Sequence, residues 1–128
     1  MPELARFGNA YDVGVFVLPG GHANQIHVLP NKFFEYVQAR LAVAIGPSTE
    51  MVRLANRWDF GIVAKTFTAE ALAAELNRTS GDRLRELKRN AGVAAEQLHA
   101  GANVELIRTI VNRALTHRAE ERAQPAGQ

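Results

Sequence analysis

The sequence contains no cysteine, which excludes disulfide bonds and thiolate chemistry and is consistent with a cytoplasmic protein. None of its apolar stretches approaches the roughly 20 residues of a transmembrane helix, so we expect no membrane-spanning segment. The first residues, 1–8, include Glu3 and Arg6 and lack the apolar centre of a signal peptide. The net charge is only +2 and no basic run is interleaved with aromatic residues, so no nucleic-acid partner is expected. The four histidines lack the spacing of metal ligands, so we expect no metal site. We expect no cofactor either.

What remains is a composition typical of one globular domain, with 47% hydrophobic and 22% charged residues in a chain of 128. We assign this domain to residues 1–118. Residues 119–128 are polar and include Pro125 and Gly127, so we expect a disordered tail there.

Three apolar runs predict short strands. The first is Tyr11 to Leu18, which Pro19-Gly20-Gly21 closes as a turn. The second is Leu41 to Ile45, whose continuous apolar character is typical of a strand covered on both faces. The third is Phe60 to Ala64.

Apolar residues at helical spacing predict a helix after each strand. The first helix would begin with Asn31 as its N-cap, with Pro30 discouraging an earlier start, and carry Phe33, Phe34, Val37 and Leu41. Ser48 or Thr49 would cap a second helix that runs to about Arg57.

Three further helices are expected in the second half of the chain. Thr68 would cap a helix over 69–77, and Ser80 would begin a longer helix that Gly101 ends. A last helix would start at Asn103 and turn an apolar stripe inward, formed by Val104, Ile107, Ile110, Val111, Ala114 and Leu115.

The alternation of strands and helices predicts an α/β fold with about three parallel strands, flanking helices and two long C-terminal helices. An open sheet of this class usually has more strands, so we interpret the chain as half of a Rossmann-like doubly wound domain. The first strand would then be an uncovered apolar edge. The first half of the domain would be missing, supplied by another chain, or replaced by self-association.

The loop over 19–30 is the strongest candidate for function, because it is longer than the usual connection of about 2–6 residues between a strand and a helix. The helix that follows presents free N–H groups, with Lys32 and Glu35 near its start. Such a helix N-terminus favours an anion.

At Pro30-Asn31-Lys32-Phe33-Phe34-Glu35-Tyr36 the chain resembles the C-terminal part of GT-B glycosyltransferases, which use a nucleotide-sugar donor. The ordered likeness runs from Tyr11 to about Leu98. It continues through the buried strand Leu41 to Ile45, the loop Gly46 to Glu50, the strand Gly61 to Val63 and the segment Thr68 to Ala73.

The resemblance implies a binding site for a nucleotide-diphospho-sugar of the UDP or GDP type. Glu35 is similar to the acidic residue that holds the ribose hydroxyls, and the preceding loop looks like the lining of the sugar and diphosphate site. The residues it assigns to donor binding are Glu35, Lys32, Asn31, Pro30, His27 and Ser48. No catalytic residue is assigned, because the acceptor domain and its base have no counterpart here.

The sequence departs from the family pattern at three positions. His27 stands where many relatives carry a second glutamate, which affects the expected sugar contact. Arg40 and Ala42 replace the Gly and Pro that flank the first residue of the buried strand in many relatives.

A fragment that resembles only the donor-binding part of these enzymes would bind donor without transferring sugar at an appreciable rate, and would need a companion N-terminal domain.

Simpler interpretations stand beside these. Glu35 and Lys32 can be solvated helix residues, Ser48 a helix cap, and His22 and His27 exposed loop residues. A receiver domain is disfavoured, because Val17 and Leu18 occupy the place of its phosphoacceptor aspartate. A second hypothesis is a non-catalytic interaction module that forms a homodimer, or docks a partner, through the first strand and terminal helices.

Overall fold

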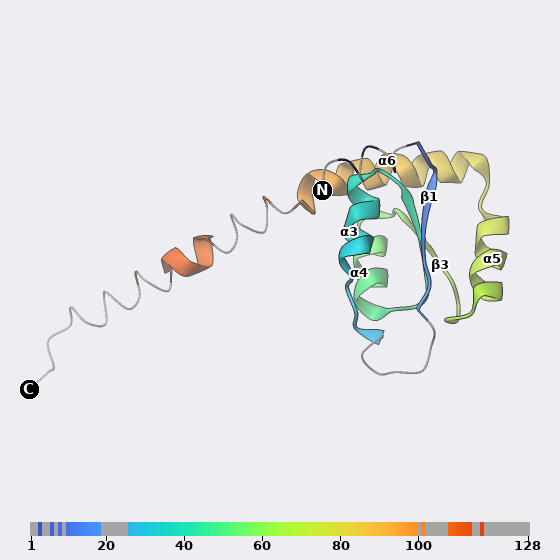
Figure 1. Ribbon diagram of the computed structural model, residues 1–128, viewed down its shortest axis with the longest axis horizontal. Helices are drawn as coiled ribbons and strands as arrows, with labels where there is room; N and C mark the ends of the chain where they lie inside the picture. Colours follow the sequence, from blue (N-terminus) through green and yellow to red (C-terminus); the bar gives the residue numbers. More distant parts are fainter. Residues whose placement is uncertain are drawn as a thin grey trace, which may run out of the picture. The chain divides into compact units, whose positions relative to one another are not determined.

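The computed structural model describes Glu3, Arg6, Gly8, residues 10–18, residues 26–99, Gly101, residues 108–113 and Thr116. The chain divides into two units, residues 1–98 and residues 99–128, which are treated separately. The first unit holds one sheet of three parallel strands in the order β1-β2-β3, flanked by helices (Figure 1). The predicted α/β class, consistent with half of a Rossmann-like domain, is confirmed.

The strands are shorter than their apolar runs. β1 is Val13–Phe16, β2 is Ala42–Ile45 and β3 is Gly61–Val63. The four residues of β1 pair in register with the four of β2, and β3 pairs with Val43 to Ile45. Every residue of β2 is buried, because it has a strand on each side and helices on both faces.

The helices divide between the two faces of the sheet (Figure 1). α3 (Asn31–Gln38) and α4 (Thr49–Trp58) share one core with Val43 and Ile45, whereas α5 (Ala69–Arg78) packs on the other face against Ala44 and Ile62. Phe33 and Phe60 are the largest fully buried side chains of the first core.

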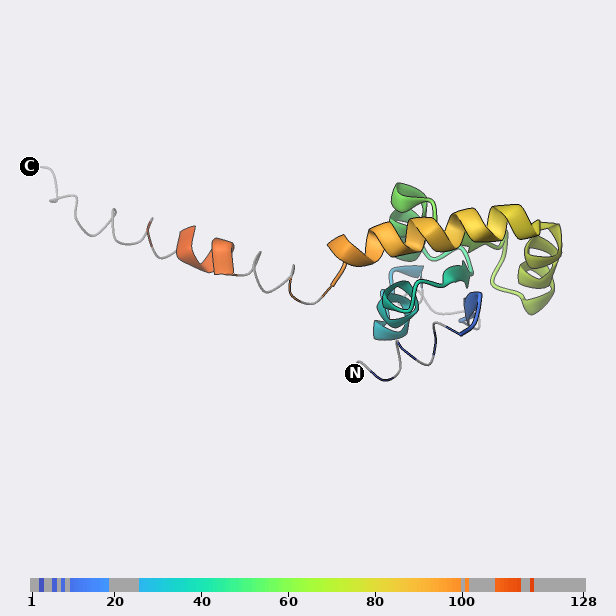
Figure 2. The same ribbon diagram turned by 90° about the horizontal axis from the view of Figure 1, so that it is seen from above.

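α6 (Gly81–Gln97) crosses the sheet at the N-terminal ends of the strands (Figures 1 and 2). Its Leu87 joins the core on the α5 face, and its Ala91 and Ala94 join the core on the α3–α4 face. The Lys88 Nζ donates to the Asp12 carboxylate at 2.7 Å and to the Tyr11 carbonyl at 3.0 Å. These contacts tie the start of β1 to α6.

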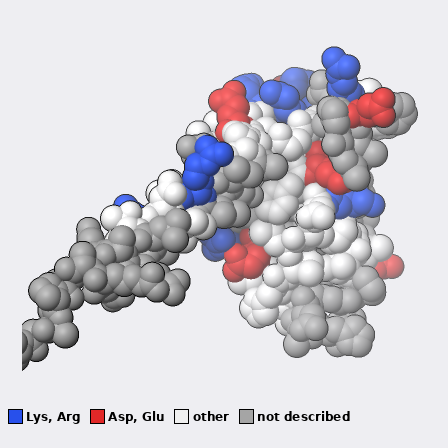
Figure 3. All heavy atoms as spheres, turned by 60° about the vertical axis from the view of Figure 1, so that its left-hand side comes forward, with Lys and Arg blue, Asp and Glu red and all other residues white. Residues whose placement is uncertain are grey.

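Further polar contacts fix α6 to the helices below it. The Gln38 side-chain amide donates to the Ala95 carbonyl at 3.0 Å. A side chain of α3 therefore provides a hydrogen bond to one of the last carbonyl groups of α6, which lack partners within the helix. Charged side chains gather mostly in the upper part of Figure 3, at the height of α6, and uncharged atoms cover most of the part below. The polar face of α6 therefore faces solvent, while its apolar face closes the sheet.

Two helix caps form as predicted, and two do not. Thr68 accepts from the Ala71 N–H and Ser80 accepts from the Arg83 N–H, both at 3.2 Å. Pro30, not Asn31, occupies the N-cap of α3, and no side chain caps that helix. Ser48 occupies the N-cap of α4 but makes no cap hydrogen bond.

α3 also ends earlier than its apolar stripe suggested. Arg40 adopts a left-handed backbone conformation with φ of 59°, which stops the helix before Leu41. Leu41 is buried nevertheless, because it leads into β2.

The second unit is described in part. Residues 108–113 are helical, and Ile110 and Val111 are exposed, so the prediction that these two face inward is wrong. In the described part of this unit, these residues have no second layer against which to bury an apolar stripe. The segment 19–25 with His22, the expected start at Asn103 and the tail 119–128 lie outside the described residues. Among the helices that the structure describes, none is long and apolar enough to cross a membrane.

Candidate functional site

The carboxyl ends of the parallel strands lie at the edge of the sheet opposite α6 (Figure 1). α3, α4 and α5 begin at this edge, because each helix runs back antiparallel to the strand before it. Ligands of open α/β sheets bind at this edge. His27, Pro30, Asn31 and Ser48 all come from segments that reach it.

Ser48 connects two of these segments from inside the protein. Its side chain is fully buried, and its hydroxyl donates to the carbonyls of Ile26 at 3.0 Å and Val28 at 3.3 Å. A hydroxyl has one proton, so these two carbonyls share it. Ser48 thus holds the chain that leads into α3, and it faces no open space where a ligand would contact it.

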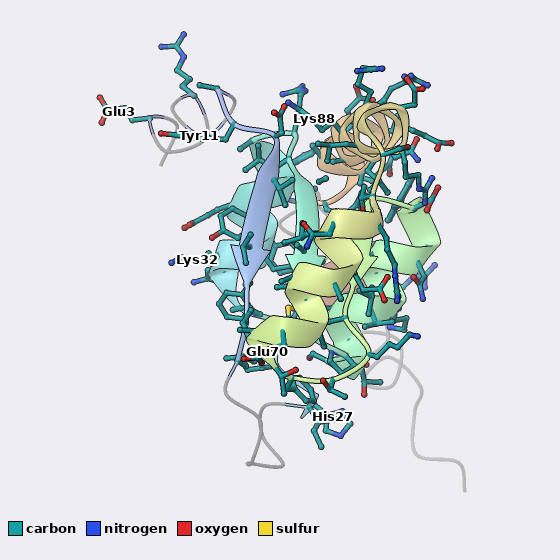
Figure 4. The ribbon with its side chains drawn as sticks, turned by 90° about the vertical axis from the view of Figure 1, so that its right-hand side faces the viewer. Glu3, Tyr11, His27, Lys32, Glu70 and Lys88 are labelled. Atoms are coloured by element: carbon teal, nitrogen blue, oxygen red, sulfur yellow. The ribbon has the colours of Figure 1, made fainter. Side chains whose placement is uncertain are left out.

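The start of α3 is open to solvent. His27, Asn31 and Lys32 are exposed, and the side chains of His27 and Lys32 point away from the protein in Figure 4. The Phe33 N–H donates to the Pro30 carbonyl at 3.0 Å, but no side chain caps α3, so the N–H groups of Asn31 and Lys32 before it stay available. The Lys32 side chain adds a positive charge beside them. This combination attracts an anion.

Glu35 lies about one helical turn further along α3 and lines a surface pocket of about 360 Å³ beside β1. Its carboxylate makes no hydrogen bond or ion pair with any residue that the structure describes. The pocket is mainly apolar and is lined by Gly8, Tyr11, Val13, Gly14, Val15, Glu35, Tyr36, Ala39 and Leu41.

One wall of the pocket is built by Tyr36, which sequence reasoning did not single out. A Cβ placed on Gly14 would lie 2.3 Å from the Tyr36 Cγ, so the ring rests directly on the strand at a position that only glycine allows. The Tyr36 hydroxyl donates to the Val15 carbonyl at 3.2 Å. A glycine inside an apolar strand is the signal that could have indicated this close approach.

The predicted donor-binding residues therefore fall into two groups. His27, Asn31 and Lys32 are exposed around the start of α3, next to Pro30, while Ser48 is buried behind them. Glu35 lies apart, in the pocket at the free side of β1.

The pKa shifts that stand out lie elsewhere. The Arg83 guanidinium donates to both carboxylate oxygens of Asp59 and lowers the pKa of that carboxyl, and hydrogen bonds to Asp59 and Glu86 raise the pKa of Arg83. Asp59 lies just before β3, at the edge that α6 covers. This pair is a structural tie between α4 and α6 rather than a proton-transfer site.

A metal-dependent site has no counterpart in the part of the chain that the structure describes, where no three acidic or histidine side chains gather around one point.

No protein-family model, curated protein or solved structure matches this chain. The resemblance to GT-B glycosyltransferases consequently rests on the pattern of residues in the sequence, and the assignment of a family stays a hypothesis.

Proposed function

We propose that this chain is the nucleotide-diphospho-sugar-binding portion of a glycosyltransferase and is not catalytic alone. The observation that carries the proposal concerns Glu35, which lines a pocket about one turn beyond the uncapped start of α3 and whose carboxylate has no partner among the described residues. The ordered resemblance from Tyr11 to Leu98 supports the same assignment.

The spacing on α3 suits the two polar parts of such a donor. One helical turn advances about 5 Å, which is comparable to the separation of a ribose ring from its diphosphate. The free N–H groups near Asn31 and the charge of Lys32 would attract the diphosphate. Glu35 would accept hydrogen bonds from the vicinal hydroxyls of the ribose.

The position of β1 explains why the chain would not transfer sugar alone. In a doubly wound domain, the ligand crosses the crevice where the strand order reverses, and both halves of the sheet contribute to that crevice. β1 is the terminal strand among those that the structure describes, so only one side of such a crevice is present. Catalysis needs the acceptor and a base held in place together, and these would come from a companion N-terminal domain.

Calorimetric titration with UDP, GDP and ADP tests the proposal. We expect one nucleotide to bind, and Glu35→Gln to weaken its binding by about 1–3 kcal/mol through the loss of charged hydrogen bonds. Glu96→Gln is the matched control, because Glu96 is an exposed acidic residue on α6, at the opposite edge of the sheet. A well-folded chain that binds none of the three nucleotides would contradict a working donor site.

A second function, a non-catalytic interaction module, is favoured by one specific observation. β1 has no neighbouring strand on its outer side among the described residues, and Val15 beside that edge is 47% exposed. An open apolar edge of this kind is a ready surface for another strand.

A further inference from the structure

The free edge of β1 has a defined set of backbone groups that face outward. The Ala42 N–H donates to the Asp12 carbonyl at 3.1 Å, so the backbone groups of Asp12 point toward β2. Backbone direction alternates along a strand, so Gly14 and Phe16 also face β2, while Val13, Val15 and Val17 present their N–H and C=O groups to the outside. In Figure 4, β1 forms the margin of the described sheet.

This edge lacks the features that usually prevent strand addition. No charged residue and no proline lies between Val13 and Leu18, and Asp12 is already paired with Lys88 of the same chain. Tyr11, Val15 and Val17 are 56%, 47% and 37% exposed. The edge is therefore both apolar and uncharged, so two copies of it meet without like-charge repulsion.

The side chains of β1 alternate between the two faces of the sheet. Gly14 faces Tyr36 on the α3 side of the sheet, and Val13 packs with the core on the α5 side. Because side chains alternate, Val13, Val15 and Val17 share the α5 side. α5 packs against β2 and β3, which leaves Val15 and Val17 partly uncovered.

We propose that β1 of a second copy of this chain occupies the edge, antiparallel to the first and centred on Val15. In this register Val15 lies opposite its own copy, and Val13 lies opposite Val17 of the second copy, so the outward groups of all three exchange hydrogen bonds. On the other face, Gly14, which the Tyr36 ring covers, lies opposite Phe16 of the second copy. The Tyr36 hydroxyl does not prevent this pairing, because the Val15 carbonyl has a second lone pair.

The two-fold arrangement also limits the assembly to a dimer. Both copies use the same edge, so the contact closes on itself and leaves no second β1 edge for growth. The contact covers few apolar side chains. A standard stable interface buries roughly 800 Å² per partner, and this contact is smaller, so the dimer is weak.

Cysteine crosslinking tests the register, because the sequence has no cysteine and each introduced one is unique. In Val15→Cys the two Cα atoms would lie about 5.5 Å apart, which is within the range of a disulfide. In Val13→Cys the equivalent atoms would be separated by roughly four residues of strand, about 13 Å, and no crosslink is expected. Val93→Cys is the control for random collision, because Val93 on α6 is 53% exposed.

We expect Val15→Cys to form the disulfide dimer at least about tenfold faster than Val93→Cys, because pairing raises the local thiol concentration. A mixture of Val13→Cys and Val17→Cys chains should give a mixed dimer. Equal rates for Val15→Cys and Val93→Cys would overturn the proposal, and so would efficient crosslinking of Val13→Cys by itself.

Sedimentation supplies a second measurement without an introduced thiol. At concentrations up to about 500 µM, where a weak interface is populated, the unmodified chain should sediment partly as a dimer. Val15→Lys should be monomeric, whereas Val93→Lys should behave like the unmodified chain. A chain that stays monomeric throughout, or a Val15→Lys chain that still dimerises, would refute the pairing. No nucleotide enters either experiment, so the result is separate from the Glu35 titration.

Discussion

Replacing Arg40 by glycine is expected to stabilise the first unit, because Arg40 occupies a left-handed backbone conformation with φ of 59°. An L-residue with a Cβ pays roughly 1–2 kcal/mol for this conformation, and glycine does not.

The gain is reduced by what the Arg40 side chain contributes. Its aliphatic stem passes over Gly92 on α6, with atoms 3.7–3.9 Å from the point where a Gly92 Cβ would be. Glycine also has more freedom in the unfolded chain, which costs about 0.5–1 kcal/mol. The balance predicts a net stabilisation of about 0.5 kcal/mol, which corresponds to a rise of roughly 2–4 °C in Tm for a unit of this size.

Asp59 supplies an internal comparison, because it is the other non-glycine residue with a positive φ among those described, at 51°. Its carboxylate accepts from Arg83, and its carbonyl accepts from the Asn90 side chain at 2.8 Å. Asp59→Gly relieves the backbone but removes the ion pair with Arg83. We therefore expect Asp59→Gly to leave stability unchanged or lower it, whereas Arg40→Gly raises it.

Urea unfolding followed by the fluorescence of Trp58 measures both changes, because this is the single tryptophan of the chain and it packs against the α3–α4 core. Arg40→Ala is the matched control, since it removes the same stem and keeps the Cβ. If Arg40→Gly is less stable than Arg40→Ala, the backbone argument is refuted.

Two further predictions follow from the packing and the charges. Gly14→Val should destabilise the first unit by about 1–3 kcal/mol, because its Cβ would meet the Tyr36 ring at 2.3 Å. Gly81→Ala is the control and should change the midpoint of urea unfolding much less, because its Cβ would have only the Arg85 side chain nearby, at 3.7 Å. The pKa of Asp59 is lowered in the folded state, so its contribution is present above the unfolded pKa of about 3.9 and is lost as the pH falls through the folded value. Both side chains of this pair are substantially exposed, so the contribution is about 0.2–1 kcal/mol, and Arg83→Gln should remove that part of the acid dependence of urea unfolding. An acid dependence unchanged by Arg83→Gln would contradict the assignment.

Local sequence signals determined the class of fold and most of its elements. The continuous apolar run before Gly46 indicated a buried strand, and β2 is covered on both faces. Thr68 and Ser80 identified two helix starts, because a cap depends on residues within a few positions of one another. The alternation of strands and helices was sufficient to predict parallel pairing, and the shortage of strands was sufficient to predict that β1 is an edge strand of the described sheet.

Only the tertiary structure decided how these elements meet. Nothing near Ser48 in the sequence indicates that its hydroxyl is shared between the carbonyls of Ile26 and Val28, which lie about twenty positions away. The crossing of α6 over the N-terminal edge depends on contacts such as Lys88 with Asp12, across 76 positions.

The candidate site shows the same division. The sequence placed Glu35 near the start of a helix, but the packing of α3 on β1 made Glu35 part of the lining of a pocket that Tyr36 and Gly14 shape. Sequence patterns report forces between residues close in the chain, such as capping and the spacing of apolar side chains. Pockets, buried hydrogen bonds and strand lengths depend on residues brought together from distant positions, so they are decided when the layers pack.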